Sequence, residues 1–153
     1  MRRYVSLFLV FSLAIIGPTT SCSEERATRV QEVTLDQLSN NPDKYNGKYV
    51  TVEGFCFHGF EVIVLSEKLE YSGYAGGHLV PKGTMVWIGG GIPKEAYDKL
   101  YQQQMMGPLE RYGKVRVRGK FEYGAEYGHL GAYSSQIVPL KIELLPWSPP
   151  AQQ

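Results

Sequence analysis

The segment 112–123 alternates strictly between two kinds of residue. Val115, Val117, Gly119 and Phe121 occupy one set of positions, and Lys114, Arg116, Arg118 and Lys120 occupy the other. A period of two is the repeat of a β-strand that turns one face to a core and the other to solvent. The chain therefore has to build a sheet that covers this apolar face.

Four other segments carry strand signals: residues 48–57, 60–65, 84–88 and 134–145. In the first of them Val50, Val52 and Cys56 share the inward face, and Gly54 marks a bend. In the last we expect an inward face of Val138, Leu140, Ile142 and Leu144. Between the second and third strands, residues 66–83 are rich in Gly and Tyr and predict a long loop.

Two helices are expected beside these strands. Thr34 can cap a short helix over residues 35–40, and Asn46-Gly47 is a strong turn signal after it. Pro93 suits the first position of a second helix, because a 3.6-residue stripe of apolar side chains continues to Met105. Gly107-Pro108 ends that helix.

The expected order is helix, three strands, helix, two strands. A mainly β fold of this order, a five-stranded barrel with a short N-terminal helix and a helix between strands 3 and 4, resembles the OB-fold. The resemblance covers residues 33–146, and residues 147–153 are a Pro-rich tail. The segments NPDKYNGKYVTVEGF, YGKVRVRGKFEYG and GHLGAY also resemble small exported bacterial proteins of uncharacterised function, lipoproteins among them. That resemblance implies no catalytic residues.

The N-terminus predicts export. Arg2 and Arg3 precede an uncharged apolar stretch of 13 residues, Tyr4 to Ile16. As a helix this stretch falls short of the roughly 30 Å hydrocarbon core of a bilayer. We therefore interpret residues 1–21 as a signal peptide.

Cys22 follows the small residues Thr19, Thr20 and Ser21. This pattern resembles a bacterial lipobox, which implies that Cys22 carries the lipid and becomes the N-terminus. Thr19 departs from it, since Leu is usual there. Simple secretion after cleavage at Ser21, or an uncleaved anchor, are the alternatives. Residues 22–32 are polar and predict a tether, and Ser23, by resemblance, favours the outer membrane of an envelope that has two membranes.

The length and the net charge of the chain limit its number of domains and its class of partner. A chain of 153 residues has room for one domain. Removal of the signal peptide leaves 14 basic against 15 acidic residues, a net charge of −1. A dedicated nucleic-acid binder is usually strongly basic, so we expect no nucleic-acid partner.

The candidate binding residues are His129, Tyr127, Tyr133, Arg116 and Arg118. His129 stands between glycines in the connection before the last strand, and in OB-folds that loop often binds a ligand. The basic stripe could hold a small anionic ligand, with Glu53 or Glu122 neutralising part of it. The tyrosines could stack on a sugar or base. The alternatives are structural: a turn, a solvated strand face and a cap on the barrel mouth.

Other chemistry has weaker signals. Cys56-x-His58, joined by His78 and His129, would be an unusual metal site, because zinc sites need three or four ligands with recognisable spacing. We expect a buried Cys56, no metal, no cofactor and no catalytic site. The expected function is a non-enzymatic binding or assembly module of the bacterial envelope, anchored at the membrane by Cys22. The alternatives are a soluble periplasmic carrier of an oligosaccharide or nucleotide, and an enzyme whose site no spacing reveals.

Overall fold

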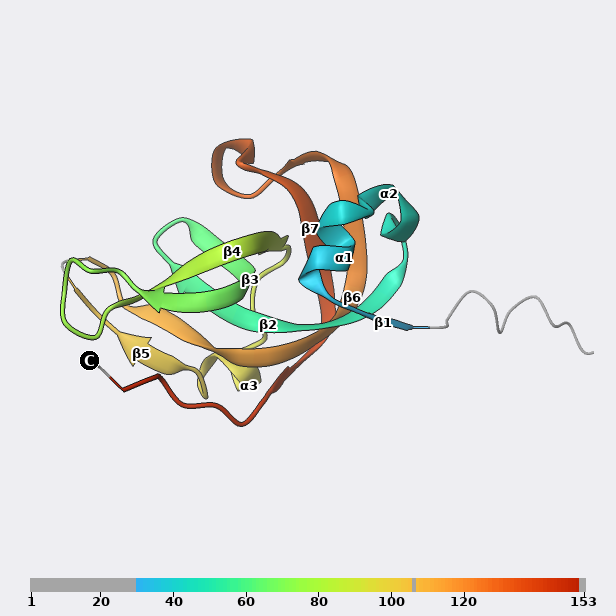
Figure 1. The fold of residues 1–153 in the computed structure, drawn as a ribbon. Coiled ribbons are helices and arrows are strands. Elements are labelled where there is room, and N and C mark those ends of the chain that lie inside the picture. The colour runs from blue at the N-terminus through green and yellow to red at the C-terminus, as the bar shows by residue number, and fades with distance from the viewer. Residues whose placement is uncertain (1–29, 106, 152–153) are drawn as a thin grey trace, which may run out of the picture.

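The computed structural model describes residues 30–105 and 107–151 (Figure 1). Five long strands dominate it: β2 (Tyr49–Gly59), β3 (Val62–Tyr71), β4 (Leu79–Ile88), β6 (Glu110–Tyr127) and β7 (Tyr133–Leu144). The short elements are β1 (Gln31–Val33), α1 (Leu35–Asn40), α2 (Pro42–Tyr45), α3 (Lys94–Tyr97), β5 (Tyr101–Gln103) and the 3-10 turn η1 (His129–Gly131). The fold is mainly β, as expected, and the described residues contain seven strands where we expected five.

All seven strands belong to one sheet, in the order β1-β2-β3-β4-β7-β6-β5. In addition β2 pairs with β6 along nearly its whole length, from Tyr49 opposite Lys120 to His58 opposite Arg111. This pairing curls the sheet into a partial ring. The link between β4 and β7 is parallel and short, with only two residue pairs, Trp87 with Gln136 and Ile88 with Ile137.

The core fills the inside of this ring. Its buried members come from the inward positions of all five long strands and from α1, and include Leu38, Val50, Val52, Cys56, Leu65, Val86, Ile88, Val115, Val117, Phe121 and Ile137. The inward faces expected for residues 48–57 and 112–123 are confirmed. At Gly54 an added Cβ would lie 2.8 Å from the carbonyl oxygen of Ser66, so β3 crosses β2 where only glycine leaves room.

The expected first helix is confirmed. The Thr34 hydroxyl accepts from the backbone N–H of Gln37, and the Gln37 side chain accepts from the N–H of Thr34, at 3.1 and 3.0 Å. This reciprocal capping box satisfies two N–H groups that a helix start otherwise leaves open. Leu35 and Leu38 then point into the core.

The long loop expected over residues 66–83 is wrong. Most of it is a hairpin, in which β3 continues to Tyr71 and β4 begins at Leu79. A bulge between Ser66 and Lys68 leaves Glu67 out of the pairing, and Gly83, at φ +77°, lies against the Glu67 side chain. Gly83, one of the glycines for which we expected a loop, therefore lies in an irregular strand pair.

The second helix is much shorter than expected. It ends at Tyr97, and Tyr101–Gln103 form β5, which pairs with β6. Tyr101 stacks on Tyr112, its partner across the pair, with ring centroids 5.8 Å apart. Pairing with an existing strand and burial of Leu100 outweigh the weak helical preference of this segment.

The inward face expected for the last strand is wrong at Val138 and Leu140. A bulge opposite Arg118 and Gly119 inserts one extra residue into β7. Ile137 is fully buried, whereas Leu140 is 65% exposed. One inserted residue exchanges the two faces of a strand. The inward residues of β7 therefore have odd numbers before the bulge, as at Ile137, and even numbers after it, as at Ile142 and Leu144.

The predicted signal peptide, Cys22 and most of the predicted tether lie outside the described residues. Gln31 and Glu32, at the end of the tether range, belong to β1, which pairs in parallel with β2. Among the described residues, no helix has the length and apolar character needed to span a membrane.

Candidate binding site

A hollow of about 520 Å³ lies where the turn between β2 and β3 approaches the η1 loop. Its lining is largely apolar and comes from four segments distant in sequence: His58, Gly59, Phe60, Glu61, Val62, Ile63, Trp87, Pro108, Leu109 and His129. Ligand sites of small molecules have this size and this mixture of many apolar groups with a few polar ones. We take this hollow as the candidate binding site.

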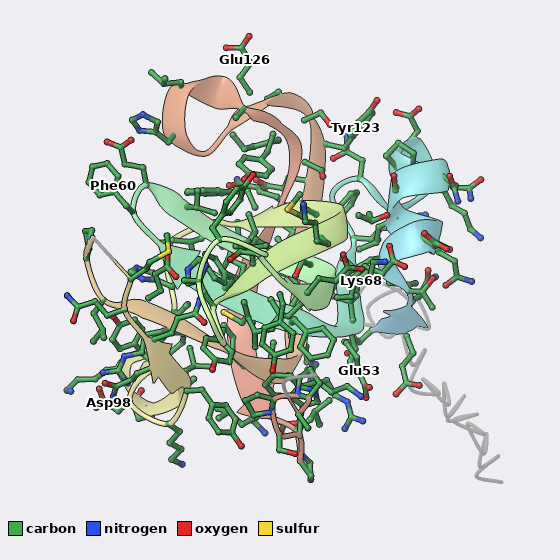
Figure 2. The ribbon with its side chains drawn as sticks, turned by 60° about the vertical axis from the view of Figure 1, so that its left-hand side comes forward. Glu53, Phe60, Lys68, Asp98, Tyr123 and Glu126 are labelled. Carbon is green, nitrogen blue, oxygen red and sulfur yellow. The ribbon has the colours of Figure 1, made fainter. Side chains whose placement is uncertain are left out.

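The β2–β3 turn presents the most exposed apolar side chain of the hollow. Phe60 is 67% exposed, and Figure 2 shows its ring pointing away from the ribbon. Glu61 beside it adopts φ +57°, a left-handed conformation that non-glycine residues rarely take. A backbone conformation of this kind costs energy, and such positions concentrate at functional sites.

The polar part of the hollow is a contact between a histidine and a carboxylate. Nε2 of His129 lies 3.1 Å from Oε2 of Glu61, and both side chains are 45% exposed. The pair connects two loops that follow different strands, β2 and β6. Glu61 therefore already contacts His129. For this reason His129 is less able to bind an anionic ligand than we expected from the sequence.

Tyr127 and Tyr133 brace the loop that carries His129. They lie opposite each other at the ends of β6 and β7. Tyr133 also packs on Trp87, with ring centroids 5.4 Å apart. Gly128 fits tightly against both rings, because an added Cβ would lie 2.7 Å from Trp87 and 2.8 Å from Tyr133. These tyrosines hold the loop in place, and Trp87 presents the aromatic surface to the hollow.

Arg116 and Arg118 lie in another part of the molecule. The strand from Arg116 to Tyr127 spans up to about 36 Å of extended chain. Both arginines line a separate recess of about 240 Å³, together with Glu32, Thr51, Lys141 and Glu143. The structure thus brings His129, Tyr127 and Tyr133 together and leaves the arginines apart from them.

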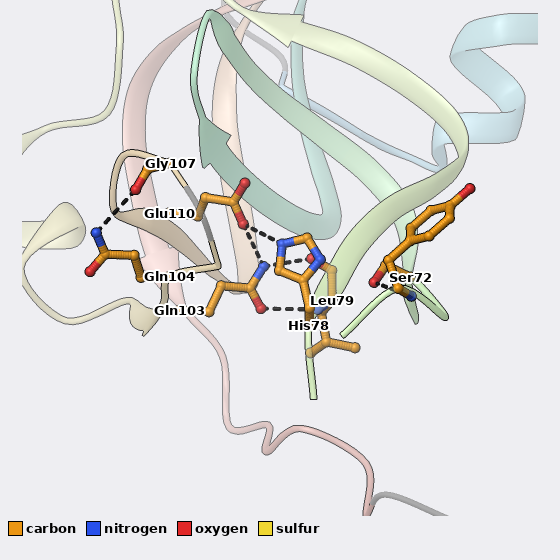
Figure 3. A network of polar contacts seen from close by, with 8 residues as sticks. Ser72, His78, Leu79, Gln103, Gln104, Gly107 and Glu110 are labelled. Carbon is orange, nitrogen blue, oxygen red and sulfur yellow. Dashed lines mark hydrogen bonds and ion pairs between the residues drawn. The ribbon is translucent and has the colours of Figure 1, made fainter. Parts of the chain in front are cut away.

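His78 belongs to a network of hydrogen bonds that links three strands. His78 Nε2 lies 2.8 Å from Glu110 Oε2, which also accepts from the Gln103 amide at 2.8 Å (Figure 3). The Gln103 side chain accepts from the N–H of Leu79 at 3.0 Å and donates to its carbonyl at 2.6 Å. The Gln103 amide thereby makes the two main-chain hydrogen bonds with Leu79 that a neighbouring strand would otherwise make. This network fastens the start of β4 to β5 and β6.

Cys56 and the metal hypothesis can be judged from burial and position. Cys56 is fully buried, as expected, and burial raises the pKa of its thiol to about 12. His58 packs on Tyr97, with ring centroids 5.3 Å apart, while His78 and His129 pair with different glutamates. Across residues 30–105 and 107–151, no three side chains of His, Cys, Asp or Glu gather to hold a metal ion.

Comparisons with protein-family models, with curated proteins and with solved structures found no match to this chain. The sequence pointed to one wall of the hollow, through His129. It missed Phe60, Glu61, Trp87 and Leu109, since their proximity arises only from the pairing of distant strands. One local feature could have indicated this part of the hollow: the turn from Gly59 to Glu61 carries a phenylalanine, although turns at a protein surface are usually polar.

Proposed function

We propose that this chain is a non-enzymatic binding module of the bacterial cell envelope, held at a membrane by lipid on Cys22. Its contact site is the hollow between the β2–β3 turn and the η1 loop. The observation that carries this proposal is the exposed Phe60 beside the Glu61–His129 pair, over a lining of apolar side chains. The net charge of −1 that remains after removal of residues 1–21, and the carboxylate in the hollow, speak against nucleic acid as the partner.

The proposed architecture is an OB-like barrel of the five long strands. Its support is the order in which the strands pair, β2-β3-β4-β7-β6 and back to β2. In an OB-fold the loops after the first and the fourth strand flank the ligand. In this chain those loops are the β2–β3 turn and the η1 loop, which carry Glu61 and His129.

The partner that fits best is an envelope protein presenting an apolar side chain beside a polar group. Phe60 and Leu109 are 67% and 39% exposed, and exposed aromatic groups that lose water on contact supply most of the affinity of protein interfaces. The Glu61–His129 pair would orient such a partner through hydrogen bonds.

A photo-crosslinking residue in place of Phe60 tests this site in cells. We expect a discrete adduct whose yield falls sharply when His129→Ala is added. The matched control is the same residue in place of Leu140, which is 65% exposed on β7. Identical adducts from both positions, or none from either, would overturn the assignment of the hollow.

A soluble carrier of an oligosaccharide is the second candidate. Trp87 offers a ring for stacking, and Glu61 and His129 offer hydrogen bonds to hydroxyl groups. A nucleotide fits less well, since its phosphates would meet the Glu61 carboxylate. Titration with neutral and anionic oligosaccharides, followed by NMR at the Trp87 indole, would support the carrier if neutral sugars shift that signal and Trp87→Phe abolishes binding.

Anchoring is tested separately. Cys22→Ser should move the protein from the membrane fraction to the soluble fraction, because stable attachment requires the several acyl chains of a lipoprotein. Intact mass should show the lipid on Cys22. An unmodified Cys22 at the N-terminus would refute the anchor and favour the soluble carrier.

A further inference from the structure

The C-terminal segment 146–150, with sequence PWSPP, lies across the outside of the sheet. Figure 1 shows it running past β5 toward the C-terminus. The N–H of Leu145 donates to the carbonyl of Lys114 at 2.9 Å, and residues 146–151 make no further backbone–backbone hydrogen bond with the described chain. The segment is therefore held by side chains and is not a strand of the sheet.

Trp147 occupies a groove of aromatic rings. Phe55, Tyr101 and Tyr112 each meet it edge to face, with ring centroids 5.2, 5.7 and 6.1 Å from the indole. Edge-to-face pairs of this kind stabilise a contact beyond the area that they bury. The groove combines residues from β2, β5 and β6, so it forms only once these strands have paired.

Two tyrosine hydroxyls fix the main chain of the segment. Tyr101 donates to the carbonyl of Trp147 at 2.8 Å, and Tyr71 donates to the carbonyl of Pro150. Prolines lack an N–H, so carbonyl oxygens are the hydrogen-bonding groups that they offer. Tyrosine hydroxyls placed along an apolar groove can donate to these carbonyl oxygens while the rings contact the prolines.

The groove continues beyond Pro150. A hollow of about 590 Å³ borders Pro150 and Ala151. It is otherwise lined by the end of β3, with Leu69 and Tyr71, and by the β3–β4 connection, with Tyr74. Tyr74 is 90% exposed. A longer segment than 146–151 could therefore make more aromatic contacts along the same line.

We propose that this groove, formed by Phe55, Tyr71, Tyr101 and Tyr112, is a recognition site for a proline-rich segment of another protein with an aromatic residue near its prolines. The chain's own residues 146–150 occupy the site in cis. Aromatic grooves bind proline-rich segments because prolines restrict the free peptide, so less entropy is lost on binding. The site shares no residue with the hollow around His129, and the proposal goes beyond the function proposed above.

The cis segment acts as a competitor. Pro146 follows directly on Leu145, the last residue with a backbone bond to β6, so no flexible linker dilutes the segment. Its effective concentration is then at least about that of a segment on a short flexible linker, which is in the millimolar range. A partner gains access when it binds more of the groove, including the part lined by Tyr74.

The test is binding of a labelled peptide, PWSPPA, to the full chain and to its Trp147→Ala variant, followed by fluorescence anisotropy. We expect the variant to bind at least tenfold more tightly than the wild type. Tyr71→Phe and Tyr101→Phe in the variant background should each weaken binding several-fold, because each removes one donor to a carbonyl. The control peptide, AWSAAA, should bind at least fivefold more weakly.

Several results would overturn the proposal. The first is that the peptide PWSPPA does not bind to Trp147→Ala even at millimolar concentration. The second is that PWSPPA and AWSAAA bind with equal affinity. The third is that the variant and the wild type bind PWSPPA with equal affinity. If Trp147→Ala fails to fold, Pro149→Ala/Pro150→Ala loosens the segment and should also increase peptide binding. A concentration-dependent dimer of the wild type that Trp147→Ala abolishes would assign the groove to a second copy of this chain and reject the partner.

Discussion

Glu53 on β2 lies directly opposite Arg116 on β6, and one carboxylate oxygen of Glu53 accepts from both Nε (3.0 Å) and Nη2 (2.5 Å) of the guanidinium. Two further basic residues on this face have acidic neighbours, since Lys120 pairs with Glu122 and Lys141 with Glu143. Arg118 forms no ion pair within the described residues. Two of the four residues of the basic stripe, Arg116 and Lys120, are therefore paired with carboxylates in place.

This pairing predicts how the stripe binds polyanions. Wild type should bind heparin only weakly at low salt. Glu53→Gln should elute from a heparin column at higher salt, because it frees the charge of Arg116. Arg116→Ala/Arg118→Ala should elute earlier, and His129→Ala should not change elution, since His129 lies elsewhere. A shift with His129→Ala equal to that of the arginine variant would contradict the separation of the two sites.

Cys56 predicts a loss of stability in alkali. Burial raises the pKa of its thiol from 9.0 to about 12. Below pH 9 the thiol is neutral in both the folded and the unfolded chain, so its full contribution to the free energy of unfolding is present. Between about pH 9 and 12 only the unfolded chain releases this proton, and the free energy of unfolding falls. Urea titrations across this range should show that part of the fall is absent in Cys56→Ala.

The same variant should cost about 1 kcal/mol at pH 7 through lost packing. A thiol reagent should label Cys56 only after denaturation. Rapid labelling of the folded protein would show that the face of Val50, Val52 and Cys56 opens to solvent.

Gly119 predicts a strong response to a single methyl group. An added Cβ would lie 2.4 Å from the carbonyl oxygen of Val138 and 3.0 Å from Cα of Pro139. These are backbone atoms of the bulged β7, so Gly119→Ala should lower the free energy of unfolding by about 2–3 kcal/mol. Gly107→Ala, which meets no atom within 4 Å, is the matched control and should stay within about 0.5 kcal/mol of wild type.

Thr34→Ala should cost about 1 kcal/mol, because it removes the acceptor for the Gln37 N–H at the start of α1. Thr34→Ser keeps the hydroxyl and should retain most of that energy. Thermal unfolding of both variants measures the difference. Equal destabilisation by Ser and Ala would show that the capping bond contributes little.

Local signals predicted the parts of the fold that depend on neighbours in sequence. The cap at Thr34, the turn at Gly47 and the alternation of residues 112–123 are of this kind. The Gly- and Tyr-rich segment 66–83 forms a bulged hairpin where we expected a long loop, because its glycines lie at the turn and beside the bulge of that hairpin. The helix after Pro93 was overextended, since its stripe of apolar side chains fits a strand partner equally well.

The candidate site was predicted in part for the same reason. His129 stood out through its flanking glycines, but nothing local indicated that Glu61 would pair with it. The stripe of Arg116 and Arg118 was read correctly as one face of a strand. The expectation that Glu53 or Glu122 neutralises part of it is confirmed, since Glu53 pairs with Arg116 and Glu122 with Lys120.

The parallel link between β4 and β7 sets where the native state opens. Trp87 with Gln136 and Ile88 with Ile137 are its only registered pairs, followed by one hydrogen bond from Gly89 to Ile137. Amides there should exchange with solvent faster than those between β2 and β6, because fewer bonds have to break. Trp87 also lines the hollow. A molecule bound there would restrain Trp87, which packs on Tyr133 of β7. We therefore expect occupancy of the hollow to slow the exchange of backbone amides at this link between β4 and β7.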